Sequence, residues 1–349
     1  MKKFFTVCLF LFCTIKAFGV NLYPINDSNS GGYIDKNGNI KIKQQFSFAY
    51  RFKDNFAIVE KNNKFGVINS KGRVVVGFKY DELKNLSENF VIYRLGDKFG
   101  IIDILKNKEY PAIFYDIKPF NEGLAAVLVK DENNLKWGFI NKKSEIVIEP
   151  KYFSVGDFSE GLASYSFEYH KTAGYLNKKG KSVLKFEDNA LDNKNFSNGL
   201  VPIIKTGENA CSYINKKGKI VINSKTIAPY KIYCGSFKNG VTVFYNDEKE
   251  DEIITGFIDK KGKIKYSKTF KVPKIYSKGE FSVFNDFSYG MAQMNLDYKT
   301  GYIDKNFKLK IPIMFEFGRD FEGDLAYIKF EDREGYINKQ GRWVWYKNR

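Results

Sequence analysis

The residues of this sequence with the clearest potential for chemistry are lysines that recur in clusters. Each cluster has the form Lys-Lys directly after an Asp or Asn, and three continue with Gly-Lys. The members are Lys142, Lys143, Lys178, Lys179, Lys181, Lys216, Lys217, Lys219, Lys260, Lys261 and Lys263. If the turns that hold them line up, their ammonium groups form a basic edge that binds an anionic polymer by counterion release. The other interpretation is that lysine is a soluble turn residue that keeps strand edges apart.

Residues that support catalysis are scarce. The chain has one histidine, His170, so neither an HExxH motif nor a Cys-His zinc set can be built. Residues 174–182 resemble a phosphate-binding loop, but five residues separate the two glycines where four are required. We therefore expect no enzyme activity, no cofactor and no metal. The alternative is a glycan-processing enzyme with carboxylates in a groove between repeats, because Asp and Glu are spread over many loops.

The N-terminus predicts export. Lys2 and Lys3 precede an apolar run from Phe4 to Ile15, and small residues precede a possible cleavage site after Gly19. This is the pattern of a signal peptide over residues 1–19, too short for a membrane span, and its cleavage leaves a mature chain of residues 20–349. The alternative is that the segment stays uncleaved as a short anchor. We expect the mature chain to have no membrane span and to be secreted, periplasmic or part of the cell envelope.

Export also bears on the cysteines and on the partners. Cys211 and Cys234 remain after cleavage, and they could form a disulfide or stay as two buried thiols. The formal net charge of the full chain is +17, which favours an anionic partner. We expect a protein or an anionic envelope polymer, and not nucleic acid, which an exported protein rarely meets.

Internal repeats decide the architecture. A motif of Gly, usually an aromatic residue, Ile or Leu, and Asp or Asn returns along the chain, and Ser replaces Gly in one copy. The copies begin at Gly32, Gly66, Gly100, Gly138, Gly174, Ser212, Gly256, Gly301 and Gly335. A second motif of the form Phe-x-x-Gly-Leu precedes most copies, with examples at Phe120, Phe158 and Phe196. Each repeat therefore predicts three short strands joined by turns.

The turn after the second predicted strand has a defined chemistry. All nine copies place Asp or Asn at its first position, and six place Gly three residues later, as in Asp35 and Gly38. The Asp or Asn side chain can bond its own backbone, and Gly supplies a positive φ where the hairpin closes. The third strand then alternates polar and apolar residues, so that one face is buried.

These motifs resemble a known family. The segments Lys136-Trp137-Gly138-Phe139-Ile140-Asn141 and Lys64-Phe65-Gly66-Val67-Ile68-Asn69, together with the Phe-x-x-Gly-Leu motif, are similar to the bacterial WG repeats, also called KWG repeats. The resemblance covers the mature chain, although Trp precedes Gly only at position 137. It implies an exported β-repeat protein with a binding role and brings no catalytic residues with it. We expect Trp137 to serve in packing.

We therefore predict an all-β fold of about nine three-stranded antiparallel repeats. An open stack is expected, because both ends hold their own strands and none is left to join them; a closed propeller-like ring is the alternative. Trp343 and Trp345 would cap the stack. The expected function is a binding or scaffold role through the repeat surface, by way of the lysine edge, on an anionic glycan or a protein.

Overall fold

The computed structural model describes most of the chain after residue 20. The described ranges are 21–28, 30–131, 134–168, 171–186, 189–190, 194–205, 208, 210–226, 231–232, 234–246, 252–271 and 283–348. The predicted signal peptide, residues 1–19, and His170 lie outside them. Within these ranges no helix is long and apolar enough to cross a membrane.

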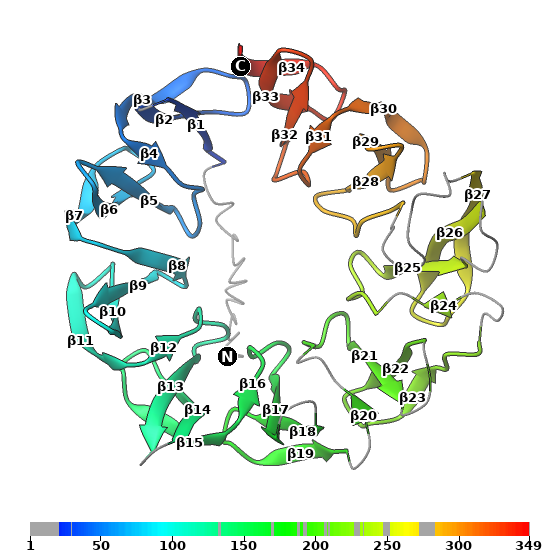
Figure 1. The fold of residues 1–349 in the computed structure, drawn as a ribbon, viewed down its shortest axis with the longest axis horizontal. Helices are drawn as coiled ribbons and strands as arrows, with labels where there is room; N and C mark the ends of the chain where they lie inside the picture. The colour runs from blue at the N-terminus through cyan, green and yellow to red at the C-terminus, as the bar shows by residue number, and fades with distance from the viewer. Residues whose placement is uncertain are drawn as a thin grey trace, which may run out of the picture.

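The described residues form nine antiparallel sheets, which we number as blades 1 to 9 in chain order. Figure 1 shows the blades around a ring, with the chain running from the inside of each blade to the outside before it enters the next. In seven blades a short innermost strand comes first. These first strands are β4 (Phe48–Ala49), β8 (Leu83–Ser87), β12 (Asp116–Ile117), β16 (Ser154–Val155), β20 (Asn189–Ala190), β24 (Lys231–Ile232) and β31 (Phe317–Gly318).

The second and third strands of each blade form a hairpin. The sheets of blades 1 and 8 have three strands, so in these two blades the numbering starts with the second strand. The second strands are β1 (Tyr23–Asp27), β5 (Phe56–Lys61), β9 (Phe90–Leu95), β13 (Ala125–Asp131), β17 (Leu162–Glu168), β21 (Leu200–Lys205), β25 (Val241–Asn246), β28 (Met291–Leu296) and β32 (Leu325–Phe330). The third strands are β2 (Ser30–Ile34), β6 (Lys64–Asn69), β10 (Lys98–Asp103), β14 (Asn134–Ile140), β18 (Lys171–Asn177), β22 (Ser212–Asn215), β26 (Glu252–Asp259), β29 (Lys299–Asp304) and β33 (Arg333–Asn338).

A fourth strand forms the outer edge of each blade. The fourth strands are β3 (Ile40–Phe46), β7 (Val74–Tyr80), β11 (Lys108–Phe114), β15 (Ile146–Tyr152), β19 (Ser182–Lys185), β23 (Ile220–Ile222), β27 (Ile264–Lys271), β30 (Leu309–Phe315) and β34 (Trp343–Asn348). The prediction of three strands a repeat missed the first strand, because most first strands have two residues and are too short to show alternation.

The repeated glycine lies where the third and fourth strands approach each other at a bulge. A Cβ atom built on Gly138 would lie 2.5 Å from the carbonyl oxygen of Ile148, and one on Gly66 would lie 2.8 Å from that of Val76. A side chain has little room at that distance, so the close pairing favours glycine; in blade 6 Ser212 takes this position. Trp137, beside this glycine, is half-buried against the cluster of blades 4 and 5, in agreement with a packing role.

The two sequence motifs meet between neighbouring blades. The aromatic residue after the repeated glycine packs edge-on against the Phe of the second motif in the next blade, as Tyr175 does against Phe196 with 4.9 Å between ring centroids. The hydroxyl of Tyr175 also donates a hydrogen bond to the carbonyl of Lys194, 2.7 Å away. Tyr33 makes both contacts from blade 1 to blade 2, with Phe52 and Tyr50. The motifs recur because each blade buries its face against the next one.

The ring closes between blade 9 and blade 1, at a junction that we call the seam (Figure 1). Tyr23, Ile25 and Ile34 of blade 1 form one buried cluster with Leu325 and Tyr336 of blade 9. The Tyr336 hydroxyl donates to the carbonyl of Pro24 at 2.9 Å. The molecule is therefore a nine-bladed β-propeller.

The closed ring is the alternative prediction, and the open stack does not form. As expected from the sequence, each end of the chain keeps its own strands and no strand is shared between them. The prediction of an open stack was wrong because side-chain packing alone closes the seam. Trp345 and Val344 pack into the seam cluster, and Trp343 packs within blades 8 and 9. The predicted end cap therefore covers another blade.

Candidate functional site

The lysine clusters lie in the turns between third and fourth strands of blades 4 to 7. Each turn has the predicted geometry. In the blade 5 turn, the Lys179 and Lys181 amides donate to the side-chain oxygen of Asn177 at 3.0 and 3.1 Å, and Gly180 has a φ of 73°. Because strands alternate in direction, these turns emerge on the same side of the ring as the turns between first and second strands. We call this side the turn face.

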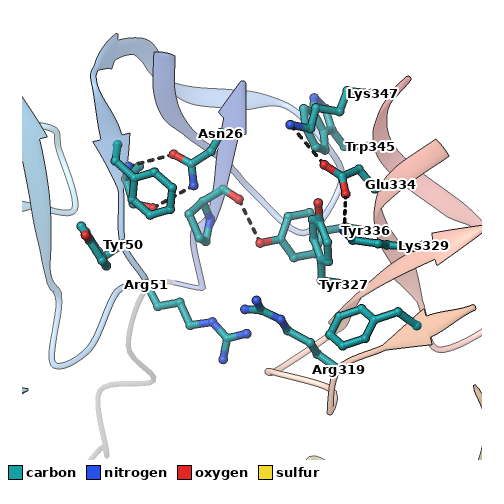
Figure 2. Close-up of a pocket in the computed structure, with 14 residues that line it drawn as sticks. Asn26, Tyr50, Arg51, Arg319, Tyr327, Lys329, Glu334, Tyr336, Trp345 and Lys347 are labelled. Carbon is teal, nitrogen blue, oxygen red and sulfur yellow. Dashed lines mark hydrogen bonds and ion pairs between the residues drawn. The ribbon is translucent and has the colours of Figure 1, made fainter. Parts of the chain in front are cut away.

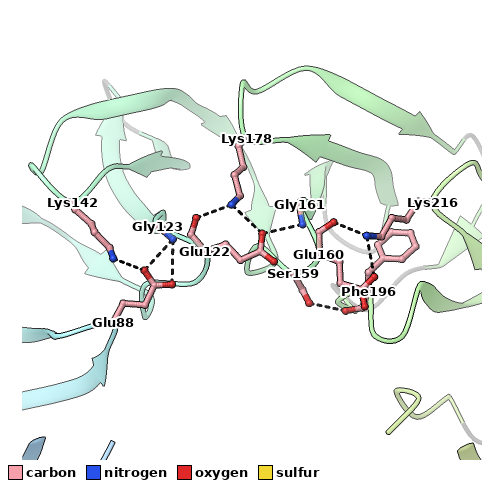
Figure 3. A network of polar contacts seen from close by, with 10 residues as sticks. All are labelled: Glu88, Glu122, Gly123, Lys142, Ser159, Glu160, Gly161, Lys178, Phe196 and Lys216. Carbon is pink, nitrogen blue, oxygen red and sulfur yellow. Dashed lines mark hydrogen bonds and ion pairs between the residues drawn. The ribbon is translucent and has the colours of Figure 1, made fainter. Parts of the chain in front are cut away.

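The first lysine of three clusters binds the blade before it. Lys142 pairs with Glu88 at 2.9 Å, Lys178 with Glu122 at 3.2 Å, and Lys216 with Glu160 at 3.1 Å. Lys178 and Lys216 also donate to the backbone carbonyls of Glu122 and Glu160 at 2.8 Å. Figure 3 shows the same arrangement from one blade to the next.

A backbone amide completes each of these contacts. The same glutamates accept hydrogen bonds from the amides of Gly123, Gly161 and Gly199, at 3.0, 2.9 and 3.1 Å. These glycines have φ values of 88°, 85° and 81°, a conformation in which side chains are strained. We call each set of Glu, Gly and Lys a clamp. Clamps join blades 3 and 4, 4 and 5, and 5 and 6.

The clamp between blades 4 and 5 lowers the pKa of its glutamate, Glu122. Partial burial acts to raise the pKa of Glu122, but the hydrogen bonds from Lys178 and the Gly161 amide outweigh it and hold the pKa below its usual value. The carboxylate is therefore ionised at neutral pH and neutralises its lysine. The first lysine of these three clusters thus serves the structure of the ring.

The remaining predicted lysines are exposed on the turn face. They are Lys143, Lys179, Lys181, Lys217, Lys219, Lys260, Lys261 and Lys263, and we call this set the lysine arc, because it follows four consecutive blades. None of them forms an ion pair with a carboxylate of the described residues. Lys260 differs from the clamp lysines because Asn198 stands where the glutamate would be.

The cysteines lie at the junction of blades 6 and 7. Cys211 and Cys234 form a disulfide with their Cα atoms 5.5 Å apart. Cys211 is fully buried in a cluster with Tyr213 and Phe237. A covalent link therefore crosses the junction where Asn198 replaces the clamp glutamate.

A cavity of about 780 Å³ lies at the seam, a size typical of ligand-binding cavities. Its residues come from β1, β4, the turn after β4, and all four strands of blade 9 (Figure 2). The lining residues are Pro24, Asn26, Phe48, Ala49, Tyr50, Arg51, Phe317, Arg319, Tyr327, Lys329, Glu334, Tyr336, Trp345 and Lys347. We call it the seam cavity. It combines aromatic rings with positive charge.

Positive charge predominates in the seam cavity. Arg51, Arg319, Lys329 and Lys347 face one lining carboxylate, Glu334. Glu334 pairs with both lysines at 3.2 Å, and although partial burial opposes them, these bonds lower its pKa. The excess stays positive when Glu322, which pairs with Arg51, is included.

Carboxylates gather beside the innermost strands of blades 8 and 9. Asp320 and Glu322 line a second cavity of about 320 Å³, which Arg51 also borders. Desolvation raises the pKa of Asp320 and of Glu322, and nearby Lys238 and Arg51 oppose the effect. Asp286 has a raised pKa for the same reason, and Lys238 lies 3.7 Å from its carboxylate. Among the described residues no group of three or more His, Cys, Asp or Glu side chains is arranged to hold a metal ion.

Sequence reasoning missed the clamp glutamates and the seam cavity. The glutamates had a signal: Glu88, Glu122 and Glu160 occupy one position of the second motif, and the blades that follow them have a Lys-Lys turn. The seam cavity had none, because Tyr50 and Trp345 are far apart in the sequence and only ring closure places them in one cavity.

The fold and these sites define a class of protein: a repeat protein built as a β-propeller with charged surfaces. Solved structures similar to the chain include apo AztD from Citrobacter koseri, 11% identical over 91% of each chain with a TM-score of 0.39. A eukaryotic initiation factor is 11% identical over 93% of this chain and 94% of that chain, with a TM-score of 0.46. No curated protein sequence matches.

A family model identifies the repeats. The model of the WG containing repeat matches residues 32–65, 65–99, 99–132, 137–168 and 301–333. Five segments of the chain are therefore WG repeats, and the predicted resemblance is confirmed.

Proposed function

We propose that the protein is a non-enzymatic binding protein, exported to the cell envelope or beyond, that holds an acidic glycan on the turn face. The lysine arc carries this proposal. Its eight lysines are exposed on consecutive blades, whereas the three clamp lysines are neutralised by glutamates. An extended row of unneutralised cations attracts a polyanion and releases its counterions on binding.

The rigidity of the arc supports the same function. Each turn is fixed by bonds from backbone amides to the Asn or Asp side chain, as in Lys217 N to Asn215 at 3.0 Å and Lys261 N to Asp259 at 2.9 Å. The clamps hold blades 4, 5 and 6 in register. A pre-organised row of charges loses less entropy on binding than a mobile one.

Binding to polygalacturonate, a carboxylated polysaccharide, tests the proposal, and its fully methyl-esterified form is the uncharged control. We expect the protein to bind the acid and not the ester, with affinity that falls as salt rises. A triple variant with Lys179, Lys217 and Lys261 changed to Gln should bind more weakly and depend less on salt.

The matched control changes three exposed lysines on the opposite side of the ring. Lys61, Lys130 and Lys299 lie in hairpins between second and third strands, so their change to Gln removes the same charge from the other face. This variant should bind nearly as the unchanged protein does. Equal losses in the two variants would show a net-charge effect and would overturn the lysine arc as the site.

A second candidate function is glycan cleavage, favoured by the raised pKa values of Asp320 and Glu322 in one cavity. A carboxyl group with a raised pKa can act as a general acid, a role open to Asp320, while Glu322, which pairs with Arg51, would act as the carboxylate partner. Reducing-end release from the same polymer measures this activity. Cleavage that is lost in Asp320→Asn and in Glu322→Gln, in folded protein, would replace the non-enzymatic proposal.

A further inference from the structure

The seam cavity contains a pair of arginines from opposite walls. Arg51 follows β4, and Arg319 follows β31. Figure 2 shows their guanidinium groups extending toward one another across the cavity. Arg51 pairs with Glu322, and Arg319 lies over the rings of Phe317 and Tyr327. Each guanidinium group has five N–H donors, so both keep donors available to an anion placed between them. Guanidinium groups match the planar carboxylate well, because their N–H donors form paired hydrogen bonds with its two oxygens.

Aromatic rings line both walls around these arginines. On the blade 9 wall, Tyr327 lies 5.3 Å from Tyr336, which lies 6.4 Å from Trp345. On the other wall Phe48 and Tyr50 pack edge-on at 4.8 Å. Phe48 and Tyr50 are 41% and 40% exposed, so apolar ring surface is available to a ligand. Such walls bind a flat or ring-shaped ligand with an apolar face.

Polar groups stand at the other end of the seam cavity. Glu334 is held between Lys329 and Lys347 at 3.2 Å from each (Figure 2). A carboxylate accepts hydrogen bonds from hydroxyl groups, and an ammonium group has three donors, of which the ion pair uses only part. The cavity therefore offers an anion site, ring platforms and a set of donors and acceptors for hydroxyls.

The residue types at these repeat positions vary around the ring. Arg319 stands where Gly156, Gly235 and Lys118 stand in other blades, and Trp345 stands where Ile42, Ile148 and Tyr110 stand. The fold therefore accepts small, basic, aliphatic and aromatic residues at these positions and does not itself require arginine or tryptophan there. A role beyond packing is consistent with their place in the seam cavity.

We propose that the seam cavity binds an acidic sugar, a pyranose ring with a carboxylate. The carboxylate lies between Arg51 and Arg319, the ring rests on the aromatic walls, and hydroxyl groups reach Glu334 and its lysines. The inference rests on the proposed function, since both take an acidic glycan as ligand, and it names a second site that holds one or two sugar units of that glycan.

Isothermal titration of the full protein with digalacturonic acid tests the site. The comparison ligands are its methyl ester, which keeps the rings and loses the charge, and inorganic phosphate, which has charge and no ring. We expect the acid alone to bind. Changing Arg319 to Gln should weaken binding about tenfold to a hundredfold, the range for a lost hydrogen bond to a charged group.

Arg342→Gln is the matched control, because Arg342 is an exposed arginine of the same blade in the turn after β33 and does not line the seam cavity. It should bind the disaccharide as the unchanged protein does. Thermal unfolding of both variants shows that they fold. Equal binding of the ester, equal binding of phosphate, or an Arg319→Gln variant that binds normally would each overturn the assignment.

The two proposals fail separately. Polymer that binds through the lysine arc, without binding of the disaccharide, overturns the seam site and leaves the proposed function in place. The opposite result is that disaccharide binding depends on Arg319 while polymer binding is unchanged in the arc lysine variant. This result supports the seam site and overturns the lysine arc as the polymer site.

Discussion

The clamped junctions of blades 3 to 6 and the seam between blades 9 and 1 hold neighbouring blades in different ways. The clamped junctions repeat one set of polar contacts, Glu to Gly amide and Lys, on top of the shared aromatic packing. The seam packs Tyr23 against Tyr336 with 5.5 Å between ring centroids. Beside this contact it leaves a cavity.

The comparison between the clamped junctions and the seam separates the contacts that close the ring from the residues that line the seam cavity. The turn glycine packs on the preceding blade at the seam and elsewhere, but against different atoms. A Cβ atom built on Gly72 would lie 3.4 Å from the side chain of Ile42, whereas one built on Gly38 would lie closer still to a backbone atom, the carbonyl oxygen of Val344. The seam therefore packs more closely on the backbone than the junction of blades 1 and 2 does. Tyr336 belongs to both the closing contact and the seam cavity, whereas Arg51, Arg319, Lys329 and Lys347 bring charge to the cavity. The proposed binding role depends on these charged residues.

The largest effect is expected at the seam. Tyr336 is buried, and Tyr336→Ala removes its packing on Tyr23 and its bond to Pro24. The free energy of unfolding should fall by about 3–5 kcal/mol, the usual range for a large buried aromatic residue. Urea denaturation measures it. Tyr336→Phe keeps the ring and should lose only about 1 kcal/mol, and Tyr289→Ala, at an exposed position, should change little. Similar losses in all three would contradict a packed seam.

The disulfide should have the next largest effect. Cys211 and Cys234 are separated by 23 residues, and a closed loop of that length stabilises the folded state by about 3 kcal/mol. A double Cys→Ala variant should therefore unfold at a lower urea concentration, because its free energy of unfolding is smaller by this amount. Adding a reductant should shift the unchanged protein in the same direction and leave the variant unaffected. An unchanged midpoint would show that the link across blades 6 and 7 is not needed.

A clamp should have a smaller effect that depends on pH. Glu122→Gln removes a charge that binds Lys178 and the Gly161 amide, and the loss at pH 7 should be about 1 kcal/mol because the pair is partly exposed. The folded pKa of Glu122 is lowered, so its stabilisation is present above the unfolded value and is lost as pH falls through the folded one. The variant and the unchanged protein should converge in stability at acid pH. A constant difference down to pH 3 would argue against the clamp.

The smallest expected effect is an increase in the free energy of unfolding. Asn198 has a φ of 55°, close to 53° at Glu160, so a glutamate fits its backbone. Asn198→Glu should bring a carboxylate to the Gly240 amide and Lys260 and build a clamp between blades 6 and 7. Because Asn198 loses its bond to the Phe237 carbonyl, the net gain should be about 0.5 kcal/mol. The double variant with Lys260→Gln should lose the gain, and a single variant that destabilises would refute the transfer.

Much of the fold could be predicted from the sequence because its determinants are local. The Asp or Asn turn, its positive-φ glycine and the three longer strands depend on residues within one repeat, as Asn177 and Gly180 show. Closure depends on the angle between blades and on contacts such as Tyr336 with Pro24, 312 residues apart. The alternation of polar and apolar residues contains no information about that angle.

The candidate site divides in the same way. The lysine turns could be located because they belong to the repeat. The pairing of Lys178 with Glu122 joins residues of two blades, and its signal in the sequence is a glutamate that recurs in the second motif before a Lys-Lys turn. The seam cavity was beyond sequence reasoning, because Arg51 and Arg319 meet only across the closed ring. The role of the lysine arc in binding stays a prediction.

Among the described residues, no backbone hydrogen bond joins the sheets of the two blades at the seam. A permuted gene that begins between any two blades should therefore encode the same ring, since no strand would be cut from its sheet. For the same reason, duplication or deletion in this lineage would proceed by whole blades, and rings of different circumference could arise while each blade keeps its own architecture.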